Sequence, residues 1–405
     1  MSSFWPRQAA LSLPLLALIP LAACGGHSRS ISSSTVNNTV TVVSNLGVTG
    51  NNVNGLFTTV TVCVPGTSNC QAIPDVIVDT GSFGLRLLGS ALNNLPLPMA
   101  TASGGGALAN CAQFASTFDW GPVASADVQL AGEKASAVPI QIMGQAGFPS
   151  PPTSCSSGLT QTDTQALLGA NGILGVGVFR YDCDVACTPG QTTIPPIYFS
   201  CPNGGGQCTA VLVNLSAQVQ NPVPLFPQDN NGVVISLPAL TAAGAISVSG
   251  TMEIGIDTQS DNALNQVTVL ATDGSGGFST TFQNTSFSGS ILDAGSNAIF
   301  FLDAATTGLA DCPSSSIAPG FYCPAATTGF NATNVAASGG ASAPASWIVD
   351  NAVTLFNSGN SAFNNLAGPN PSNFDFGLPF FFGRTIFVGV NGGAAGNFTG
   401  PFFAY

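Results

Sequence analysis

Charged side chains are scarce in this sequence, and basic ones are the scarcest. Asp, Glu, Lys and Arg make up 6% of the 405 residues, with 18 acidic residues against six basic ones and a formal net charge of −12. Nucleic-acid backbones are bound through clustered Lys and Arg side chains, because these neutralise phosphate. A chain this acidic is therefore not expected to bind DNA or RNA.

Histidine and lysine each occur once, as His27 and Lys134. A Ser-His-Asp or Cys-His device needs a His beside its nucleophile, and structural zinc sites need Cys/His clusters. His27 lies in the stretch that reads as a flexible tether, and no Ser-x-x-Lys surrounds Lys134. The glycine run Gly172–Gly177 lacks the Lys of a phosphate-binding loop. We expect no metal and no cofactor, which leaves carboxylates as the candidate chemistry.

No uninterrupted run of about 18 apolar residues follows the first 24 residues, so a membrane-spanning helix is not expected. The start has a basic residue, the apolar run Ala9–Ala23 and then Cys24, as in a secretory signal. Leu21–Cys24 resembles the bacterial lipobox, in which the Cys is acylated and becomes the mature N-terminus. The sequence thus predicts a signal peptide over residues 1–23 and a lipid anchor at Cys24.

The lipid anchor at Cys24 is one of two interpretations of this N-terminal segment. The alternative is an ordinary signal peptide with an incidental Cys at position 24. Gly25 stands where an inner-membrane retention signal usually has Asp, which favours the outer membrane, on its periplasmic or surface face. The expected partner at this end of the chain is therefore the lipid bilayer.

Eleven cysteines are an odd number until Cys24 is set aside for the lipid. The remaining ten can form five disulfides, which is typical of an oxidising compartment outside the cytoplasm. Connectivity does not follow from sequence, and the simplest set pairs neighbours along the chain. These pairs are Cys63–Cys70, Cys111–Cys155, Cys183–Cys187, Cys201–Cys208 and Cys312–Cys323.

Short apolar runs joined by Gly, Pro and Asn turns predict an all-β protein with few short helices. We expect a flexible tether over residues 24–45, an N-terminal β lobe over 46–225 and a C-terminal β lobe over 226–405, because the Pro-rich stretch Asn221–Pro227 separates two similar halves. The helix predictions are Gln165–Leu168 and Ser346–Phe356. Val211–Leu215 is among the strand predictions.

The clearest pattern is an internal duplication. The strand ending at Val78 runs into Asp79-Thr80-Gly81-Ser82, and the strand ending at Leu292 runs into Asp293-Ala294-Gly295-Ser296. In each half another apolar strand follows at once, and a Gly-punctuated apolar strand follows later, at Gly172–Phe179 and from Phe376. The repeat predicts two related lobes that each contribute one acidic turn.

These motifs resemble those of pepsin-like aspartic proteases. Val76–Ser82 and Ser290–Ser296 resemble the two catalytic motifs, and Asn171–Gly177 resembles the family's Asp-Gly-Ile-Leu-Gly-Leu strand. Phe118–Gly121 falls at the place of the flap hairpin, and Phe376-Gly377 resembles the Ile-Leu-Gly segment of the second lobe. The resemblance covers most of residues 50–405. The chain also resembles a bacterial family of secreted, cysteine-rich lipoproteins.

The resemblance implies a bilobal fold of two related six-stranded-type lobes, in which Asp79 and Asp293 face each other across a peptide-binding cleft. Two carboxylates held close together share one proton, so one can activate a water while the other protonates the peptide carbonyl. Gly81 and Gly295 then permit tight turns, and Ser82 and Ser296 orient the carboxylates.

In pepsin-like proteases, the residue after each catalytic Asp usually carries a hydroxyl that crosses to the opposite loop. Thr80 keeps this hydroxyl and Ala294 lacks it. Trp120 and Gly121 take the place of the flap, with Trp120 at the usual Tyr, and a plain packing role for Trp120 is the alternative.

Two functions remain open at this point. One is an aspartic endopeptidase that acts as a monomer on peptides outside the cytoplasm. The other is an inactive pepsin-fold binding or structural lipoprotein. In a further, purely structural alternative, Asp79 and Asp293 only cap their turns. A glycosidase also uses two carboxylates, but Asp-x-Gly-Ser repeats are not typical of that chemistry.

Overall fold

The computed structural model describes residues 37–202 and 207–405. The predicted signal peptide at 1–23, the lipidation residue Cys24 and His27 lie outside the described residues. The described residues contain no helix that is long and apolar enough to cross a membrane.

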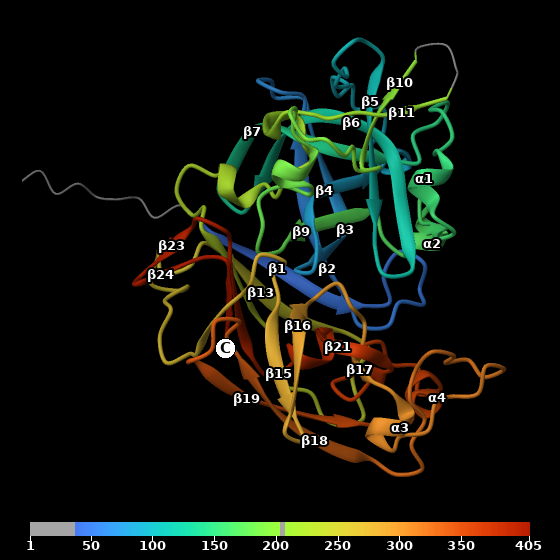
Figure 1. Cartoon of the computed structure of the whole chain (residues 1–405), viewed down its shortest axis with the longest axis vertical. Coiled ribbons are helices and arrows are strands. Elements are labelled where there is room, and N and C mark those ends of the chain that lie inside the picture. Colours follow the sequence, from blue (N-terminus) through green and yellow to red (C-terminus); the bar gives the residue numbers. More distant parts are fainter. Residues whose placement is uncertain (1–36, 203–206) are drawn as a thin grey trace, which may run out of the picture. The chain divides into compact units, whose positions relative to one another are not determined.

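The chain is built mainly of short strands (Figure 1). The first half contains β1 (Thr39–Asn45), β2 (Gly55–Cys63), β3 (Cys70–Asp79), β4 (Phe83–Leu88), β5 (Ala107–Gln113), β6 (Thr117–Leu130), β7 (Glu133–Met143), β8 (Thr160–Gln161), β9 (Gly172–Val176), β10 (Tyr198–Cys201) and β11 (Thr209–Ala210). The second half contains β12 (Gly232–Ser236), β13 (Val248–Ile254), β14 (Val269–Ala271), β15 (Phe278–Phe282), β16 (Thr285–Asp293), β17 (Ile299–Leu302), β18 (Thr328–Val335), β19 (Ser342–Val349), β20 (Ala367–Gly368), β21 (Asn370–Gly377), β22 (Thr385–Gly389), β23 (Ala394–Ala395), β24 (Phe398–Thr399) and β25 (Phe402–Ala404).

Helices are short. The α-helices are α1 (Thr153–Ser156), α2 (Gln165–Leu168), α3 (Ala304–Thr307) and α4 (Ala352–Phe356), and single 3-10 turns are η1 (Gly89–Ala91), η2 (Asp184–Cys187), η3 (Leu215–Ala217), η4 (Val223–Leu225) and η5 (Leu378–Phe380). The predicted all-β, bilobal fold class with few short helices is confirmed, and this is the class that the resemblance to pepsin-like proteins implies.

Two large sheets make up the fold, and the larger one contains strands of both halves. A 16-stranded sheet runs in the order β11-β10-β5-β6-β7-β4-β9-β3-β2-β1-β13-β12-β22-β25-β14, with β8 beside β6, and a seven-stranded sheet runs in the order β19-β18-β15-β16-β21-β17-β20. The pair β23–β24 is separate. Antiparallel pairing of β1 with β13 joins strands of the first half to strands of the second. The lobe limits at 225 and 226 therefore stay a prediction, because strand pairing is continuous across the halves.

Three sequence predictions need correction. Within the predicted tether, Thr39–Asn45 is strand β1, whose Val42 is fully buried. Ser346–Phe356 is not one helix, because Trp347 and its neighbours pair with β18 as part of β19, and α4 begins only after Asn351 caps it. Val211–Leu215 is not a strand, since β11 ends at Ala210 and η3 begins at Leu215. Gln165–Leu168 is confirmed as α2.

The two halves differ in how they are stabilised. All five predicted disulfide pairs are confirmed, and four of them, Cys63–Cys70, Cys111–Cys155, Cys183–Cys187 and Cys201–Cys208, lie in the first half. The second half has Cys312–Cys323. Its core instead contains a cluster of aromatic rings in mutual contact, among them Phe301, Phe374 and Phe376.

Candidate active site

The two Asp-x-Gly-Ser turns occupy equivalent places in a repeated unit of three strands. In the first half, β9 runs parallel to β3 with Gly175 opposite Asp79, and antiparallel to β4. In the second half, β21 runs parallel to β16 with Gly377 opposite Asp293, and antiparallel to β17. The predicted internal duplication is confirmed in the strand pairing.

The third strand of each unit, β9 or β21, carries a glycine opposite the Asp because a side chain would not fit there. A Cβ on Gly175 would lie 2.6 Å from the backbone nitrogen of Phe83, and one on Gly377 would lie 2.1 Å from the carbonyl oxygen of Ala298. Both contacts are too short for real Cβ atoms. The chain that leaves each acidic turn can therefore pass close to the third strand only because these two positions carry no side chain.

Each carboxylate is held by its own turn. Asp79 accepts hydrogen bonds at Oδ1 from the N–H groups of Gly81 (2.8 Å) and Ser82 (3.1 Å), and at Oδ2 from the Ser82 hydroxyl (2.5 Å). Asp293 accepts at Oδ1 from the Gly295 N–H (2.8 Å) and at Oδ2 from the Ser296 hydroxyl (2.8 Å). The predicted orienting roles of Ser82 and Ser296 fit these contacts.

The two turns also contact each other. The Gly81 N–H lies 3.1 Å from Oδ1 of Asp293 as well as 2.8 Å from Oδ1 of Asp79, so the two carboxyl groups share one donor. A Cβ on Gly81 would lie 2.6 Å from Oδ2 of Asp293, and one on Gly295 would lie 2.6 Å from Oδ1 of Asp79. Each glycine thus leaves room for the acid of the opposite half.

A threonine hydroxyl locks the turns together. Thr80 Oγ1 donates to the carbonyl oxygen of Leu292 and accepts from the N–H of Ala294, both at 2.8 Å. This is the crossing bond that the resemblance implies for Thr80. Ala294 is 1% exposed and has a methyl group in place of a hydroxyl, so it cannot return the bond.

The pair is electrostatically unequal. Asp79 is 7% exposed, and its burial, together with the nearby charge of Asp293, raises the pKa of Asp79 to about 8, against the opposing hydrogen bonds from Ser82 and Gly81. Loss of hydration disfavours a buried anion, and a second carboxylate nearby disfavours it further. At neutral and acidic pH Asp79 therefore holds a proton beside Asp293.

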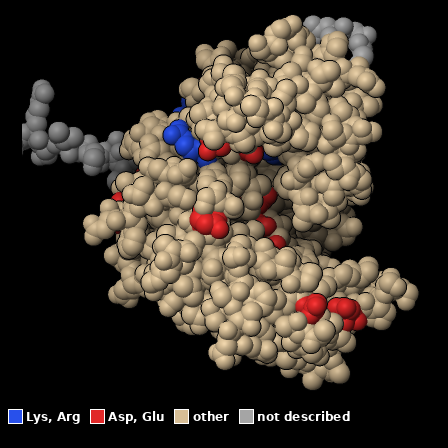
Figure 2. Space-filling view, in the orientation of Figure 1, with Lys and Arg blue, Asp and Glu red and all other residues tan. Residues whose placement is uncertain are grey.

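A cleft of about 760 Å³ opens over the acids. Its lining includes Asp79 and Asp293 together with Phe114 and Thr117, which belong to the turn and strand start of the β5–β6 hairpin. Figure 2 shows acidic side chains along the hollow of this face. The size suits a small molecule or several residues of a peptide.

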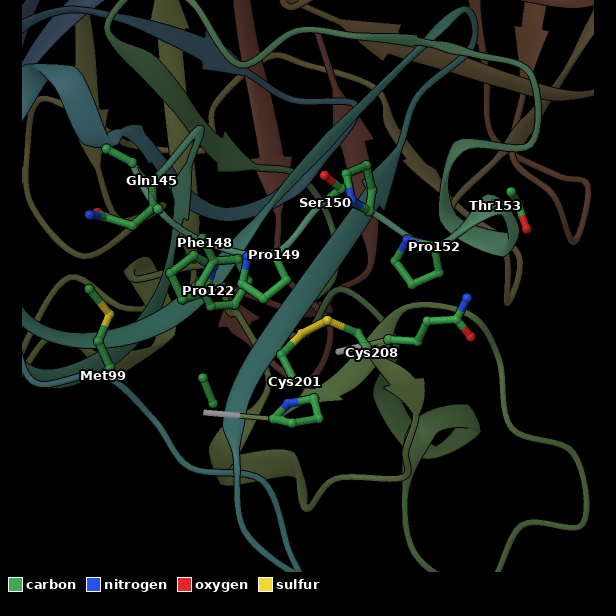
Figure 3. A pocket seen from close by; sticks show the side chains of 16 residues that line it. Met99, Pro122, Gln145, Phe148, Pro149, Ser150, Pro152, Thr153, Cys201 and Cys208 are labelled. Atoms are coloured by element: carbon green, nitrogen blue, oxygen red, sulfur yellow. A yellow bond between two sulfur atoms is a disulfide. The ribbon is translucent and has the colours of Figure 1, made fainter. Parts of the chain in front are cut away.

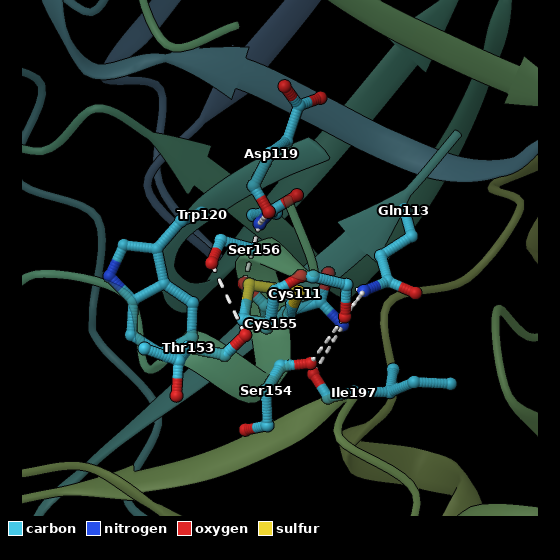
Figure 4. The surroundings of a disulfide bond; sticks show 12 residues. Cys111, Gln113, Asp119, Trp120, Thr153, Ser154, Cys155, Ser156 and Ile197 are labelled. Atoms are coloured by element: carbon cyan, nitrogen blue, oxygen red, sulfur yellow. Dashed lines mark hydrogen bonds between the residues drawn. A yellow bond between two sulfur atoms is a disulfide. The ribbon is translucent and has the colours of Figure 1, made fainter. Parts of the chain in front are cut away.

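Trp120 does not line this cleft, which corrects its predicted place over the substrate. Its side chain is buried beside the Cys111–Cys155 disulfide (Figure 4). Its indole N–H donates to the carbonyl oxygen of Pro149 at 2.7 Å. A Cβ on Gly121 would lie 1.8 Å from the carbonyl oxygen of Ile142, so this glycine serves the packing of β6 on β7. The packing alternative for Trp120 holds.

Three cleft residues were not anticipated from the sequence. Arg86 and Asp182 form a buried ion pair, with Nη2 3.2 Å from Oδ2, in the cleft wall. Asp375 on β21 is a third carboxyl group at the dyad, 2.6 Å from the Ser296 hydroxyl. The signal for Asp375 is a lone acid inside the apolar run around Phe374 and Phe376.

A larger hollow lies elsewhere. It has a volume of about 1090 Å³ and is lined mainly by proline, small residues and the Cys201–Cys208 disulfide (Figure 3). No titratable side chain is among its described lining residues. It has no acid–base groups for catalysis, so the smaller cleft is the candidate active site. In the described ranges, no cluster of three His, Cys, Asp or Glu side chains is placed to hold a metal ion.

Comparison with known proteins gives a family and a structural likeness. Residues 33–405 match the family model described as "Protein of unknown function (DUF3443)", and the chain belongs to this family. Among solved structures, the crystal structure of an aspartic proteinase from Irpex lacteus is similar over 90% of this chain and 96% of that chain, with 13% sequence identity and a TM-score of 0.48. No curated protein matches the chain.

Proposed function

We propose that this protein is an aspartic endopeptidase whose catalytic residues are Asp79 and Asp293. The observation that carries the proposal is that the two carboxyl groups meet at the Gly81 N–H, which lies within hydrogen-bond distance of both. Turns that used Asp79 and Asp293 only as local caps would not require the acids to meet. Nor would they require glycine where each turn faces the opposite acid.

The unequal pair assigns the proton roles. Asp293, as the anion, takes a proton from a water held between the carboxyls, and the water oxygen bonds to the carbonyl carbon of the peptide. Asp79 gives its proton to the carbonyl oxygen, which forms a neutral tetrahedral diol. The diol collapses when Asp79 takes a proton back and Asp293 gives its proton to the amide nitrogen as the C–N bond breaks. Protons and electrons balance within the dyad and the water, and no cofactor is needed.

The cleft supports a peptide substrate. Its wall includes residues of the β5–β6 turn, Phe114 and Thr117, and the apolar side chains of Leu167 and Ile291. An extended peptide bound along this wall would pass Asp79 and Asp293, because both acids line the same cleft.

The proposed setting is outside the cytoplasm. The five disulfides favour an oxidising compartment. The export signal and acylated Cys24 predicted from the sequence would anchor the chain to the bacterial outer membrane.

One observation favours a second candidate, an inactive pepsin-fold binding or structural lipoprotein. Ala294 cannot return the crossing bond of Thr80, so the two turns are joined by a single hydroxyl. A looser dyad would still form the cleft and could hold a peptide without cleaving it.

The deciding experiment measures cleavage of an unfolded protein by the exported chain, purified in detergent, over the acidic pH range. The proposal predicts cleavage by the wild type and loss of cleavage in Asp79→Asn. Asp303→Asn is the matched control, because Asp303 caps α3 and Asn caps a helix equally well. Cleavage that survives in Asp79→Asn would reject the dyad. Binding of the unfolded protein without cleavage by the wild type would favour the second candidate.

A further inference from the structure

Asp375 occupies a position at which the two halves differ. It lies on β21 opposite Ile291, two residues before the pairing of Gly377 with Asp293. The equivalent position in the first half is Ile173 on β9, which lies opposite Ile77. The second half therefore places a carboxyl group where the first half has an apolar side chain.

The contacts of Asp375 connect it to the dyad. Ser296 Oγ lies 2.8 Å from Oδ2 of Asp293 and 2.6 Å from Oδ2 of Asp375. The other oxygen of Asp375, Oδ1, is buried and has no hydrogen-bond partner among the described residues. A single hydroxyl thus lies between two carboxyl groups.

The Ser296 hydroxyl has too few protons for both of its short contacts. A serine hydroxyl carries one proton, so it can donate to only one of two carboxyl groups. The other short contact needs a proton on the carboxyl group itself. Asp293 accepts N–H bonds from Gly81 and Gly295, which favour its anion, whereas Oδ1 of Asp375 accepts none. The extra proton therefore belongs on Asp375.

The surroundings of Asp375 favour the same assignment. Of the elements beside β21, β16 brings Asp293, while β17 and η5 carry no titratable side chain, and Asp79 faces Asp375 across the site. These neighbours supply no cation. Burial first, and then the charges of Asp293 and Asp79, raise the pKa of Asp375 well above its usual range, against the bond from Ser296.

We propose that Asp375 is a positioning residue that acts as a neutral acid. It donates its proton to Ser296 Oγ, and Ser296 donates in turn to Oδ2 of Asp293, so that Asp293 stays the ionised member of the dyad. A hydroxyl that accepts a hydrogen bond is a stronger donor, so the chain of two bonds favours the Asp293 anion more than Ser296 alone would. This inference rests on the proposed endopeptidase function for its catalytic consequence, but the proton on Asp375 does not depend on it.

Two variants of Asp375 distinguish a role as a hydrogen-bond donor from a role in packing alone. Asp375→Asn keeps an N–H that can donate to Ser296, and Asp375→Ile copies Ile173 of the first half and has no donor. We expect Asp375→Asn to keep kcat and the pH profile. In Asp375→Ile we expect kcat to fall about tenfold at unchanged KM, because a hydrogen bond that supports an anion is lost. The acidic limb of its kcat profile should move to higher pH, because the Asp293 anion then lacks a supporting hydrogen bond.

Either of two results on activity would overturn the inference. The first is an Asp375→Ile variant with the wild-type kcat and acidic limb. The second is an Asp375→Asn variant as impaired as Asp375→Ile, since that would mean that the anion of Asp375 is needed. A denaturation midpoint for each variant shows whether any loss of activity is a loss of folded protein.

A readout without activity makes the test independent of the endopeptidase. Carboxyl carbon resonances of Asp-labelled protein, followed by NMR over pH, identify Asp375 as the signal missing in both variants. We expect this signal to keep its protonated shift through neutral pH. Titration near the ordinary Asp value of about 3.9 would refute the neutral acid. A wild type that cleaves nothing while Asp375 stays protonated would refute the endopeptidase and leave the neutral acid supported.

Discussion

The two halves of the site share their scaffold and differ in their polar groups. Each half holds its acid at the end of a strand, with Gly175 or Gly377 of a third strand directly opposite. Two equivalent positions next to this scaffold differ. The hydroxyl of Thr80 corresponds to the methyl group of Ala294, and the carboxyl group of Asp375 corresponds to the apolar side chain of Ile173. The comparison teaches that a duplicated scaffold can bring two identical acids together while the side chains around them differ.

The largest effect expected from this difference is on the pH dependence of stability. The pKa of Asp79 is raised from 3.8 to about 8 by burial and by Asp293, so between these values the folded state binds a proton that the unfolded state lacks. Stability therefore falls as pH rises through this window. Asp79→Asn has no charge to bury, so its gain in unfolding free energy over the wild type should grow from near zero at about pH 4 to several kcal/mol at about pH 8.

Denaturant melts of both proteins at a series of pH values measure this gain. Asp303→Asn should show a flat difference from the wild type over the same range, because Asp303 is fully exposed and its pKa is lowered by the hydrogen bonds of Thr306. A flat difference for Asp79→Asn as well would mean that Asp79 is ionised in the folded protein at neutral pH, and the two acids would then be equal.

The glycines that face the opposite acids offer a way to break the shared scaffold. Gly81→Ala and Gly295→Ala each place a methyl group 2.6 Å from a carboxyl oxygen of the other half, so the two acids must move apart. We expect each variant to lose about a hundredfold in kcat/KM, because displacements of about 1 Å at a reacting centre have effects of this size. Gly329→Ala is the matched control, because a Cβ there meets nothing within 4 Å and φ, as at Gly81 and Gly295, is not positive. Equal activity in all three variants would contradict the facing geometry.

Much of the site was predictable, because an Asp-x-Gly-Ser turn fixes its own contacts locally. The meeting of Asp79 with Asp293 and the crossing bond of Thr80 were expected from the resemblance to pepsin-like proteases. Trp120 was wrongly placed because the tip of the β5–β6 hairpin lies at Phe114–Thr117, and where a hairpin turns depends on strand register. Asp375 was missed for a similar reason, since only its pairing opposite Ile291 brings it to the dyad.

Removal of the crossing hydroxyl sharpens the comparison between Thr80 and Ala294. Thr80→Val keeps the shape of the side chain but leaves the Ala294 N–H and the Leu292 carbonyl oxygen without their partner. The unfolding free energy should fall by about 2 kcal/mol, the usual cost of unpaired buried polar groups. Urea denaturation measures this loss, provided that the dependence of the unfolding free energy on urea concentration is unchanged. Thr59→Val, at an exposed position of β2, should leave stability within about 0.5 kcal/mol.

The smallest effect is expected from restoring symmetry. Ala294→Ser gives the second turn a hydroxyl, and because the turns are related, this hydroxyl should reach the backbone of the first turn as Thr80 reaches Leu292. We expect a gain of about 1 kcal/mol in unfolding free energy. A loss of similar size would show that the two turns differ in more than this one side chain.

The central claim is that the two halves build one unequal acid pair, and the pH dependence of kcat/KM for a peptide substrate tests it most directly. We predict a bell-shaped profile whose alkaline limb falls near pH 8, where Asp79 loses its proton, and no activity at any pH in Asp79→Asn or Asp293→Asn. A rate that keeps rising well above pH 8, or that survives in either variant, would contradict the account.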